Sequence, residues 1–159
     1  MIRVIGVGQR FRHDDAVGLV VAERLVESVD SSSVEVITAS GEGTDLMDRW
    51  RGAGTVVIVD AVASEADPPG TIYRWQAHDT PIPAEIFPQS THLFSLPQAI
   101  ELARVFGELP PRLIVFGVVG ADFHMGEGLS ASVADSIDDV VRRIEADVGD
   151  AVQVGERHA

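Results

Sequence analysis

The feature that most constrains the fold is an alternation of short β-branched runs with stretches of helical spacing. The strand-like runs are almost uniformly apolar, which is typical of strands buried on both faces of a parallel sheet. They cover residues 2–7, 34–38, 55–59 and 112–118, and the helical stretches cover 15–29, 45–50, 95–106 and 130–148. The alternation predicts one three-layer α/β/α domain over residues 1–149, with a twisted, mostly parallel sheet of about five strands and helices on both faces.

Two segments depart from this alternation. Residues 61–91 hold five of the eight prolines, so this part of the chain cannot form one long regular element. We expect an edge strand at residues 71–76 and an irregular loop or short helical turns in the remainder. Residues 150–159 follow Gly149 and are expected to form a frayed C-terminal tail.

The composition excludes several kinds of chemistry. The 159 residues include no Cys and no Lys, which removes thiol nucleophiles, cysteine-held metal clusters, Schiff-base lysines and Walker-type phosphate loops. Twenty-five acidic residues against twelve basic ones give a net charge of −13, which would repel phosphate backbones and anionic lipid. The apolar runs are too short to span a bilayer, and the N-terminal run lacks the pattern of a signal peptide. We therefore expect a cytoplasmic protein that binds neither nucleic acid nor membrane.

The topology predicts where a site would form. In open parallel sheets, sites lie beyond the carboxyl ends of strands where the strand order reverses, and we expect the first and third strands to be neighbours there. The loop after the first strand carries Asp14 and Asp15, and the third strand ends at Asp60, the only charged residue in 55–63. We therefore expect Asp15 to lie near Asp60, with Asp14 as the N-cap of the first helix. The alternative for Asp60 is a structural role in capping a turn or helix.

A third candidate is His92, which lies just before the predicted helix at 95–106. Two carboxylates and one imidazole would form an open site that suits Ni, Zn, Mn or Fe and leaves positions for water and substrate. The alternative is a capping or surface histidine. The glycine pattern after the first strand, G-V-G-Q-R-F, lacks the third glycine of a dinucleotide fingerprint, which argues against nucleotide binding.

Four blocks of sequence, in order and spread over nearly the whole chain, resemble the hydrogenase maturation proteases. The blocks are I-G-V-G-Q-R-F-R-H-D-D-A-V-G; V-D-A-V with P-P-G-T downstream; S-T-H-L-F-S-L; and F-G-V-V-G-A-D-F with G-L-S at the start of the last helix. By this resemblance, Asp15, Asp60 and His92 occupy the family's three metal-contacting and catalytic positions. The loop after the second strand departs from the common D-G-G-T-x-G and reads T-A-S-G-E-G, in which Gly41 and Gly43 are candidates for substrate binding.

The resemblance implies an endopeptidase, of aspartic or metal-assisted type, that acts on the large-subunit precursor of a nickel–iron hydrogenase. It would remove the C-terminal extension of that precursor after nickel insertion. The nickel would be carried by the substrate and recognised by the three site residues, and no permanently bound metal is implied. The alternative from another class is a non-catalytic, nickel-dependent chaperone or binding module for a metalloenzyme precursor. A mass shift of the precursor would separate the two.

Overall fold

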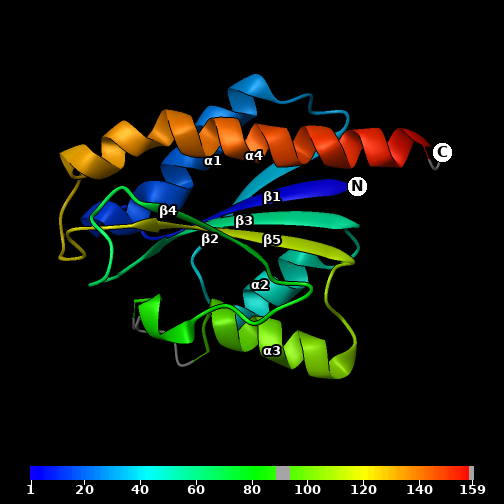
Figure 1. The fold of residues 1–159 in the computed structure, drawn as a ribbon, viewed down its shortest axis with the longest axis horizontal. Coiled ribbons are helices and arrows are strands. Elements are labelled where there is room, and N and C mark those ends of the chain that lie inside the picture. The colour runs from blue at the N-terminus through cyan, green and yellow to red at the C-terminus, as the bar shows by residue number, and fades with distance from the viewer. Residues whose placement is uncertain (89–93, 158–159) are drawn as a thin grey trace.

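The computed structural model describes residues 1–88 and 94–157 (Figure 1). In these residues five strands form one sheet, in the order β2-β1-β3-β5-β4. Four of the strands are parallel: β1 (Ile2–Val7), β2 (Val34–Ala39), β3 (Thr55–Val62) and β5 (Arg112–Val119). The fifth, β4 (Ile72–Gln76), pairs antiparallel with β5 at the edge. The predicted mostly parallel sheet and its edge strand are therefore confirmed.

Helices cover both faces of the sheet and complete the predicted three layers. Figure 1 shows α1 and α4 on one face and α2 and α3 on the other. Their bounds are Val17–Ser28 for α1, Gly43–Trp50 for α2, Leu96–Phe106 for α3 and Ala131–Arg157 for α4. Short 3-10 turns precede α1 at His13–Ala16 and follow β4 at Ala84–Ile86. Each face has its own apolar core, because the sheet side chains point alternately to the two helical layers.

Helix α3 illustrates how local sequence signals determine where a helix begins and ends. Helix α3 begins after Ser95, whose N–H donates to the side chain of Gln98 at 2.8 Å. Pro97 lies in the first turn, where its missing N–H costs no helical hydrogen bond. The helix ends at Gly107, which adopts the left-handed conformation with φ 67°. Start and end therefore lie within a residue of the expected helix at 95–106.

The frayed tail predicted after Gly149 is wrong, because α4 continues as helix to Arg157. Val148 and Ala151 remain buried and continue the apolar stripe of the helix against the first core. Gly149 itself is exposed on the opposite side, so it does not interrupt this packing. Although α4 is long, no helix in the described part of the chain is long and apolar enough to cross a membrane.

The end of β3 also differs from expectation. The sequence predicts a strand that ends at Asp60, whereas β3 continues to Val62 because β5 pairs with it along its whole length. Pairing with β1 stops earlier, at Gly6 opposite Val59. Asp60 is therefore the first residue of β3 beyond its last pair with β1. The predicted neighbourhood of the first and third strands is confirmed, and β1 and β3 diverge at this point.

Candidate active site

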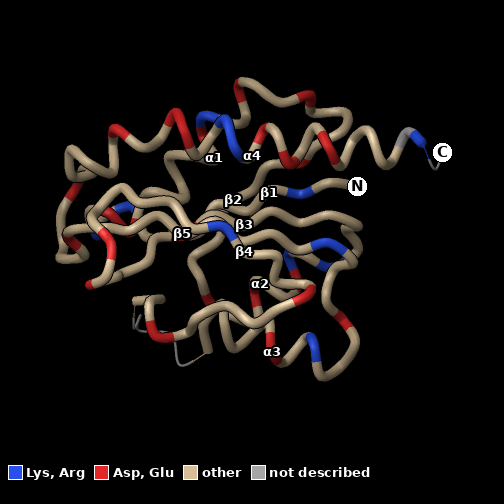
Figure 2. Tube along the Cα trace, in the orientation of Figure 1, with Lys and Arg blue, Asp and Glu red and all other residues tan. Residues whose placement is uncertain are grey.

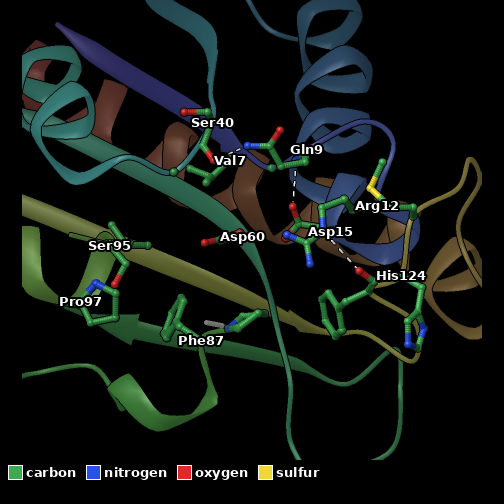
Figure 3. Close-up of a pocket in the computed structure, with 16 residues that line it drawn as sticks. Val7, Gln9, Arg12, Asp15, Ser40, Asp60, Phe87, Ser95, Pro97 and His124 are labelled. Atoms are coloured by element: carbon green, nitrogen blue, oxygen red, sulfur yellow. Dashed lines mark hydrogen bonds between the residues drawn. The ribbon is translucent and has the colours of Figure 1, made fainter. Parts of the chain in front are cut away.

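A crevice opens where β1 and β3 diverge, and its volume is about 460 Å³ (Figure 3). Its walls are the loop after β1, the start of the loop after β2, the segments flanking residues 89–93, and the loop after β5. The residues that line it are Val7, Gly8, Gln9, Arg12, Asp15, Ser40, Gly41, Asp60, Phe87, Pro88, Ser95, Leu96, Pro97, Phe123, His124 and Met125. Asp15 and Asp60 therefore share one crevice, as the topology predicts.

Asp60 lies at the base of the crevice and is partly buried. Its carboxylate accepts the N–H of the next residue, Ala61, at 2.8 Å. Burial raises the pKa of Asp60 well above its ordinary value, and the negative charge of Asp15 raises this pKa further. The hydrogen bond from Ala61 acts in the opposite direction and does not compensate. A carboxyl group in this setting retains its proton at a higher pH than a solvated aspartate does.

Asp15 is positioned by the turn that leaves β1. The backbone N–H of Gln9 donates to Asp15 Oδ2 at 2.9 Å, and the N–H of Asp15 donates to the carbonyl of Arg12 at 3.1 Å. Gly8 allows this turn, because a Cβ atom there would lie 2.0 Å from the carbonyl oxygen of Asp15. The tight turn thus directs the Asp15 side chain toward the carboxyl end of β3.

His92, the third predicted site residue, lies outside the described residues. Within residues 1–88 and 94–157, no group of three or more His, Asp or Glu side chains is arranged to hold a metal ion. The described part of the crevice therefore offers two carboxylates, Asp15 and Asp60, as oxygen ligands. The roles of all three residues stay a prediction.

The two candidate glycines occupy different places. Gly41 lines the crevice and adopts φ +102°, a conformation that favours glycine. Gly43 is the first residue of α2, and its N–H donates to the carbonyl of Phe94 at 2.8 Å. A Cβ atom on Gly43 would lie 2.3 Å from the Phe94 ring, so this glycine permits close packing of α2 against the segment before α3. Of the two, Gly41 lines the crevice and Gly43 does not, and a substrate contact at either stays a prediction.

Asp14 has a role that the sequence did not indicate. Its prediction as the N-cap of the first helix is wrong: the N-cap of α1 is Ala16, which makes no side-chain cap. Asp14 is instead fully buried, and its carboxylate joins the loop after β5 to the loop after β1. It accepts hydrogen bonds of 2.7 to 3.0 Å from Ala121 N–H, Asp122 N–H, Ser130 N–H and Ser130 Oγ. We call these four bonds the Asp14 network.

Backbone contacts reinforce the same junction. The N–H of His13 donates to Gly126 O at 3.0 Å, and the N–H of Gly126 donates to Phe11 O at 2.8 Å. The side chain of Arg12 donates from Nε to Phe123 O at 3.3 Å. The loop after β5 is therefore fixed against the loop after β1, and it brings Phe123, together with His124 and Met125, to one side of the crevice.

Comparison with known proteins assigns the chain to a class. A sequence profile of the HycI hydrogenase maturation protease family matches residues 19–147. The chain therefore belongs to the hydrogenase maturation protease family. The Hydrogenase 2 maturation protease of Escherichia coli strain K12 is 26% identical over 147 residues, which are 91% of this chain and 88% of that protein. The hydrogenase expression/formation protein HupD of Thiocapsa roseopersicina is 31% identical over 118 residues, or 74% of this chain and 53% of that protein.

Solved structures show the same fold. The hydrogenase maturating endopeptidase HybD from E. coli matches with a TM-score of 0.80 at 24% identity, covering 94% of this chain and 93% of that one. The [NiFe] hydrogenase maturation protease HybD from Thermococcus kodakarensis matches with a TM-score of 0.70 at 22% identity, covering 91% of this chain and 97% of that one. The expected α/β architecture and family resemblance are thus confirmed.

Proposed function

We propose that the chain is a processing endopeptidase that removes the C-terminal extension of a nickel–iron hydrogenase large-subunit precursor after nickel insertion. The observation that carries the proposal is the pair Asp15 and Asp60, which share one crevice in a chain of the hydrogenase maturation protease family. The crevice lies beyond the carboxyl ends of β1 and β3, the edge of a parallel sheet at which ligands bind.

Recognition in this proposal depends on nickel already held by the precursor. Asp15 and Asp60 supply carboxylate oxygens, and His92 supplies an imidazole nitrogen, to coordination positions that the precursor leaves open. A precursor without nickel would offer these side chains no bond to form, and two carboxylates facing each other without a cation repel. Nickel on the substrate therefore serves as a checkpoint, because cleavage follows only productive binding.

A general base is most effective when its pKa lies near the working pH, and raising the pKa of an aspartate brings it closer to that condition. Asp60 can serve as this base through the carboxylate oxygen that does not bind nickel, and before the precursor binds its pKa is raised by burial and by the charge of Asp15. In the proposed step, Asp60 takes a proton from a water molecule while the water oxygen attacks the scissile carbonyl carbon. The same carboxyl group then donates that proton to the leaving nitrogen as the peptide bond breaks. Nickel on the substrate would supply Lewis-acid polarisation of the carbonyl.

The experiment that tests the proposal is intact mass spectrometry of the large-subunit precursor after incubation with this protein, with and without nickel loading. We expect a C-terminal peptide to be lost only from the nickel-loaded precursor. Loss from both forms would retain the peptidase activity and remove the checkpoint. Stable complex formation without any cleavage would replace the proposal with a nickel-dependent binding module.

A further inference from the structure

We propose that Arg12 is a substrate-binding residue whose guanidinium group donates to a backbone carbonyl oxygen of the precursor segment that enters the crevice. The inference rests on the proposed function and adds a residue to its substrate-recognition surface. Arg12 was not singled out by the sequence, since it differs from the other arginines only in its surroundings.

The position of Arg12 is fixed by the two loops that meet at the crevice. The N–H of Arg12 donates to Gln9 O at 3.4 Å, its carbonyl accepts the N–H of Asp15, and its backbone forms a bridge to Gly126. The side chain lines the crevice, and Figure 3 shows the guanidinium turned toward the space beside Asp15. The hydrogen bond from Nε to Phe123 O restrains the side chain as well, which reduces the freedom it loses when it binds a ligand.

The guanidinium of Arg12 uses only one of its N–H donors within the described residues. Its Nε–H donates to Phe123 O at 3.3 Å, and within the described residues the two terminal nitrogens have no hydrogen-bond acceptor. These nitrogens carry four N–H groups, which form the planar fork that arginine uses to bind oxygen atoms. The guanidinium of Arg12 is therefore held through Nε, and its terminal N–H groups are available to a molecule in the crevice.

Among the described residues Arg12 also has no carboxylate in ion-pair distance, which is unusual in this chain. Acidic residues outnumber basic ones by twenty-five to twelve, and Figure 2 shows acidic positions spread over many elements. Ten of the twelve arginines pair with a carboxylate within the described part of the chain. The two without such a pair are Arg12 and Arg157, and Arg157 is the last described residue. A cation in the crevice of so acidic a protein, with no carboxylate partner among the described residues, points to a ligand.

The charge of the crevice favours a neutral oxygen over an acidic one. A carboxylate that approached Arg12 would also approach Asp15 and Asp60, and like charges in a partly enclosed space repel. A peptide carbonyl binds the guanidinium without that repulsion. The exposed side chains of Phe11 and Met125, on either side of the same junction, offer apolar contacts to the side chains of an extended peptide. The ligand class is therefore the peptide backbone of the precursor.

The test compares Arg12→Leu and Arg12→Lys with wild-type protein on the nickel-loaded precursor. Arg10→Leu is the matched control, because Arg10 is two residues away and pairs with Glu23 on the surface. We expect Arg12→Leu to raise KM by roughly 10- to 100-fold, the effect of losing hydrogen bonds from a charged donor, with kcat changed less than about threefold. Arg12→Lys should recover part of the loss, and Arg10→Leu should behave as wild type.

Four outcomes would overturn the inference. An unchanged KM for Arg12→Leu would show that the guanidinium does not bind substrate. A fall in kcat at constant KM would make it a catalytic group instead. A loss of thermal stability equal in Arg12→Leu and Arg12→Lys would leave only the structural bond to Phe123. Wild-type affinity that falls steeply with salt, a dependence absent from Arg12→Leu, would identify an acidic ligand.

Failure of the proposed function can be distinguished from failure of this inference. If wild-type protein does not cleave the precursor, the proposed function fails, and the dissociation constant of the precursor complex still tests Arg12. We expect the same 10- to 100-fold weakening of that complex in Arg12→Leu. If wild-type protein cleaves and Arg12→Leu matches it in both rate and affinity, only the inference about Arg12 fails.

Discussion

Asp14 and Asp60 are two carboxylates at the same end of the sheet, and their surroundings differ in the supply of hydrogen-bond donors. Asp14 is fully buried and accepts four hydrogen bonds from the loop after β5. Asp60 is partly buried, accepts the N–H of Ala61, and faces the negative charge of Asp15. Burial alone therefore does not decide whether a carboxylate stabilises the fold or is suited to proton transfer.

The number of hydrogen-bond donors around each carboxylate distinguishes the structural role of Asp14 from the chemical role proposed for Asp60. Donors around Asp14 replace the water that the carboxylate loses on folding, so its charge stabilises the junction of two loops. Among the described residues only the N–H of Ala61 replaces the water that Asp60 loses, and a second carboxylate, Asp15, lines the same crevice. Its charged form is therefore disfavoured, so its carboxyl group exchanges a proton at a higher pH than a solvated aspartate does. Substitution of Asp14 should lower the stability of the fold. Substitution of Asp60 should abolish cleavage and raise the stability of the fold.

The largest expected effect is the loss of cleavage in Asp60→Asn. An amide of the same shape cannot accept the proton of the attacking water, so we expect the rate on nickel-loaded precursor to fall by at least about 10³-fold. Asp15→Asn should also abolish processing, because under the proposed function it would remove a ligand for the nickel on the precursor. Intact mass measured over time gives the rates, and Asp135→Asn, at an exposed position on α4, serves as the control. Wild-type rates in both variants would exclude these carboxylates from the reaction.

The second prediction concerns stability and the Asp14 network. Asp14→Ala leaves the N–H groups of Ala121, Asp122 and Ser130 without their acceptor, so we expect a loss of about 3 kcal/mol or more. For a chain of this length the melting temperature should fall by roughly 6 to 12 °C. Asp15→Asn is the matched comparison one residue away and should shift the melting temperature by much less. Equal losses in the two variants would contradict the difference drawn between these neighbours.

The third prediction uses the raised pKa of Asp60. Near pH 3.8, the ordinary value for aspartate, the group is largely protonated in the folded chain and begins to ionise in the unfolded chain. As pH rises above that value, the unfolded chain releases this proton first, so the contribution of Asp60 to the free energy of unfolding falls until the folded-state pKa is passed. Asp60→Asn removes this dependence. Its stability relative to wild type should therefore rise with pH and level off once the folded-state pKa of Asp60 is passed.

Thermal melts of wild type and Asp60→Asn between pH 4 and pH 8 measure this difference. A gain that is the same at every pH would mean that ionisation of Asp60 is not its cause. Asp15→Asn offers a control for the second contribution, because it removes the charge that raises the pKa of Asp60 while the burial of Asp60 remains. In that background the gain from Asp60→Asn should be smaller and should be complete at a lower pH.

Much of this arrangement follows from the sequence because it depends on local pattern and general topology. The run 55–59 is apolar on both faces, so its place inside a parallel sheet could be predicted, and with it the position of Asp60 at the carboxyl edge. The meeting of Asp15 with Asp60 follows from the usual neighbourhood of the first and third strands. His92 lies outside the described residues, so its place beside them stays a prediction.

What the sequence did not predict depends on partners far along the chain or on which side of a helix a residue faces. The donors to Asp14 lie between 107 and 116 residues away, and no local pattern connects them to the loop after β1. The role proposed for Arg12 likewise depends on its having no carboxylate partner among the described residues, which no local pattern indicates. Glycine is unfavourable inside a helix, so Gly149 predicts a helix end. It faces solvent, however, and Val148 and Ala151 on either side of it remain packed in the core, so α4 continues.

The smallest expected effect is that of Ser130→Ala, which removes one of the four donors of the Asp14 network. Ser130 Oγ donates to Asp14 Oδ2 at 2.8 Å, and the two backbone N–H groups that share this oxygen remain in the variant. We therefore expect a loss of about 1 kcal/mol, seen as a fall of roughly 2 to 4 °C in the melting temperature. The loss should disappear in the Asp14→Ala background, because the hydroxyl then has no carboxylate to bind. Equal losses in both backgrounds would show that Ser130 acts on α4 alone, and Asp14 would then hold the loop after β5 through backbone donors only.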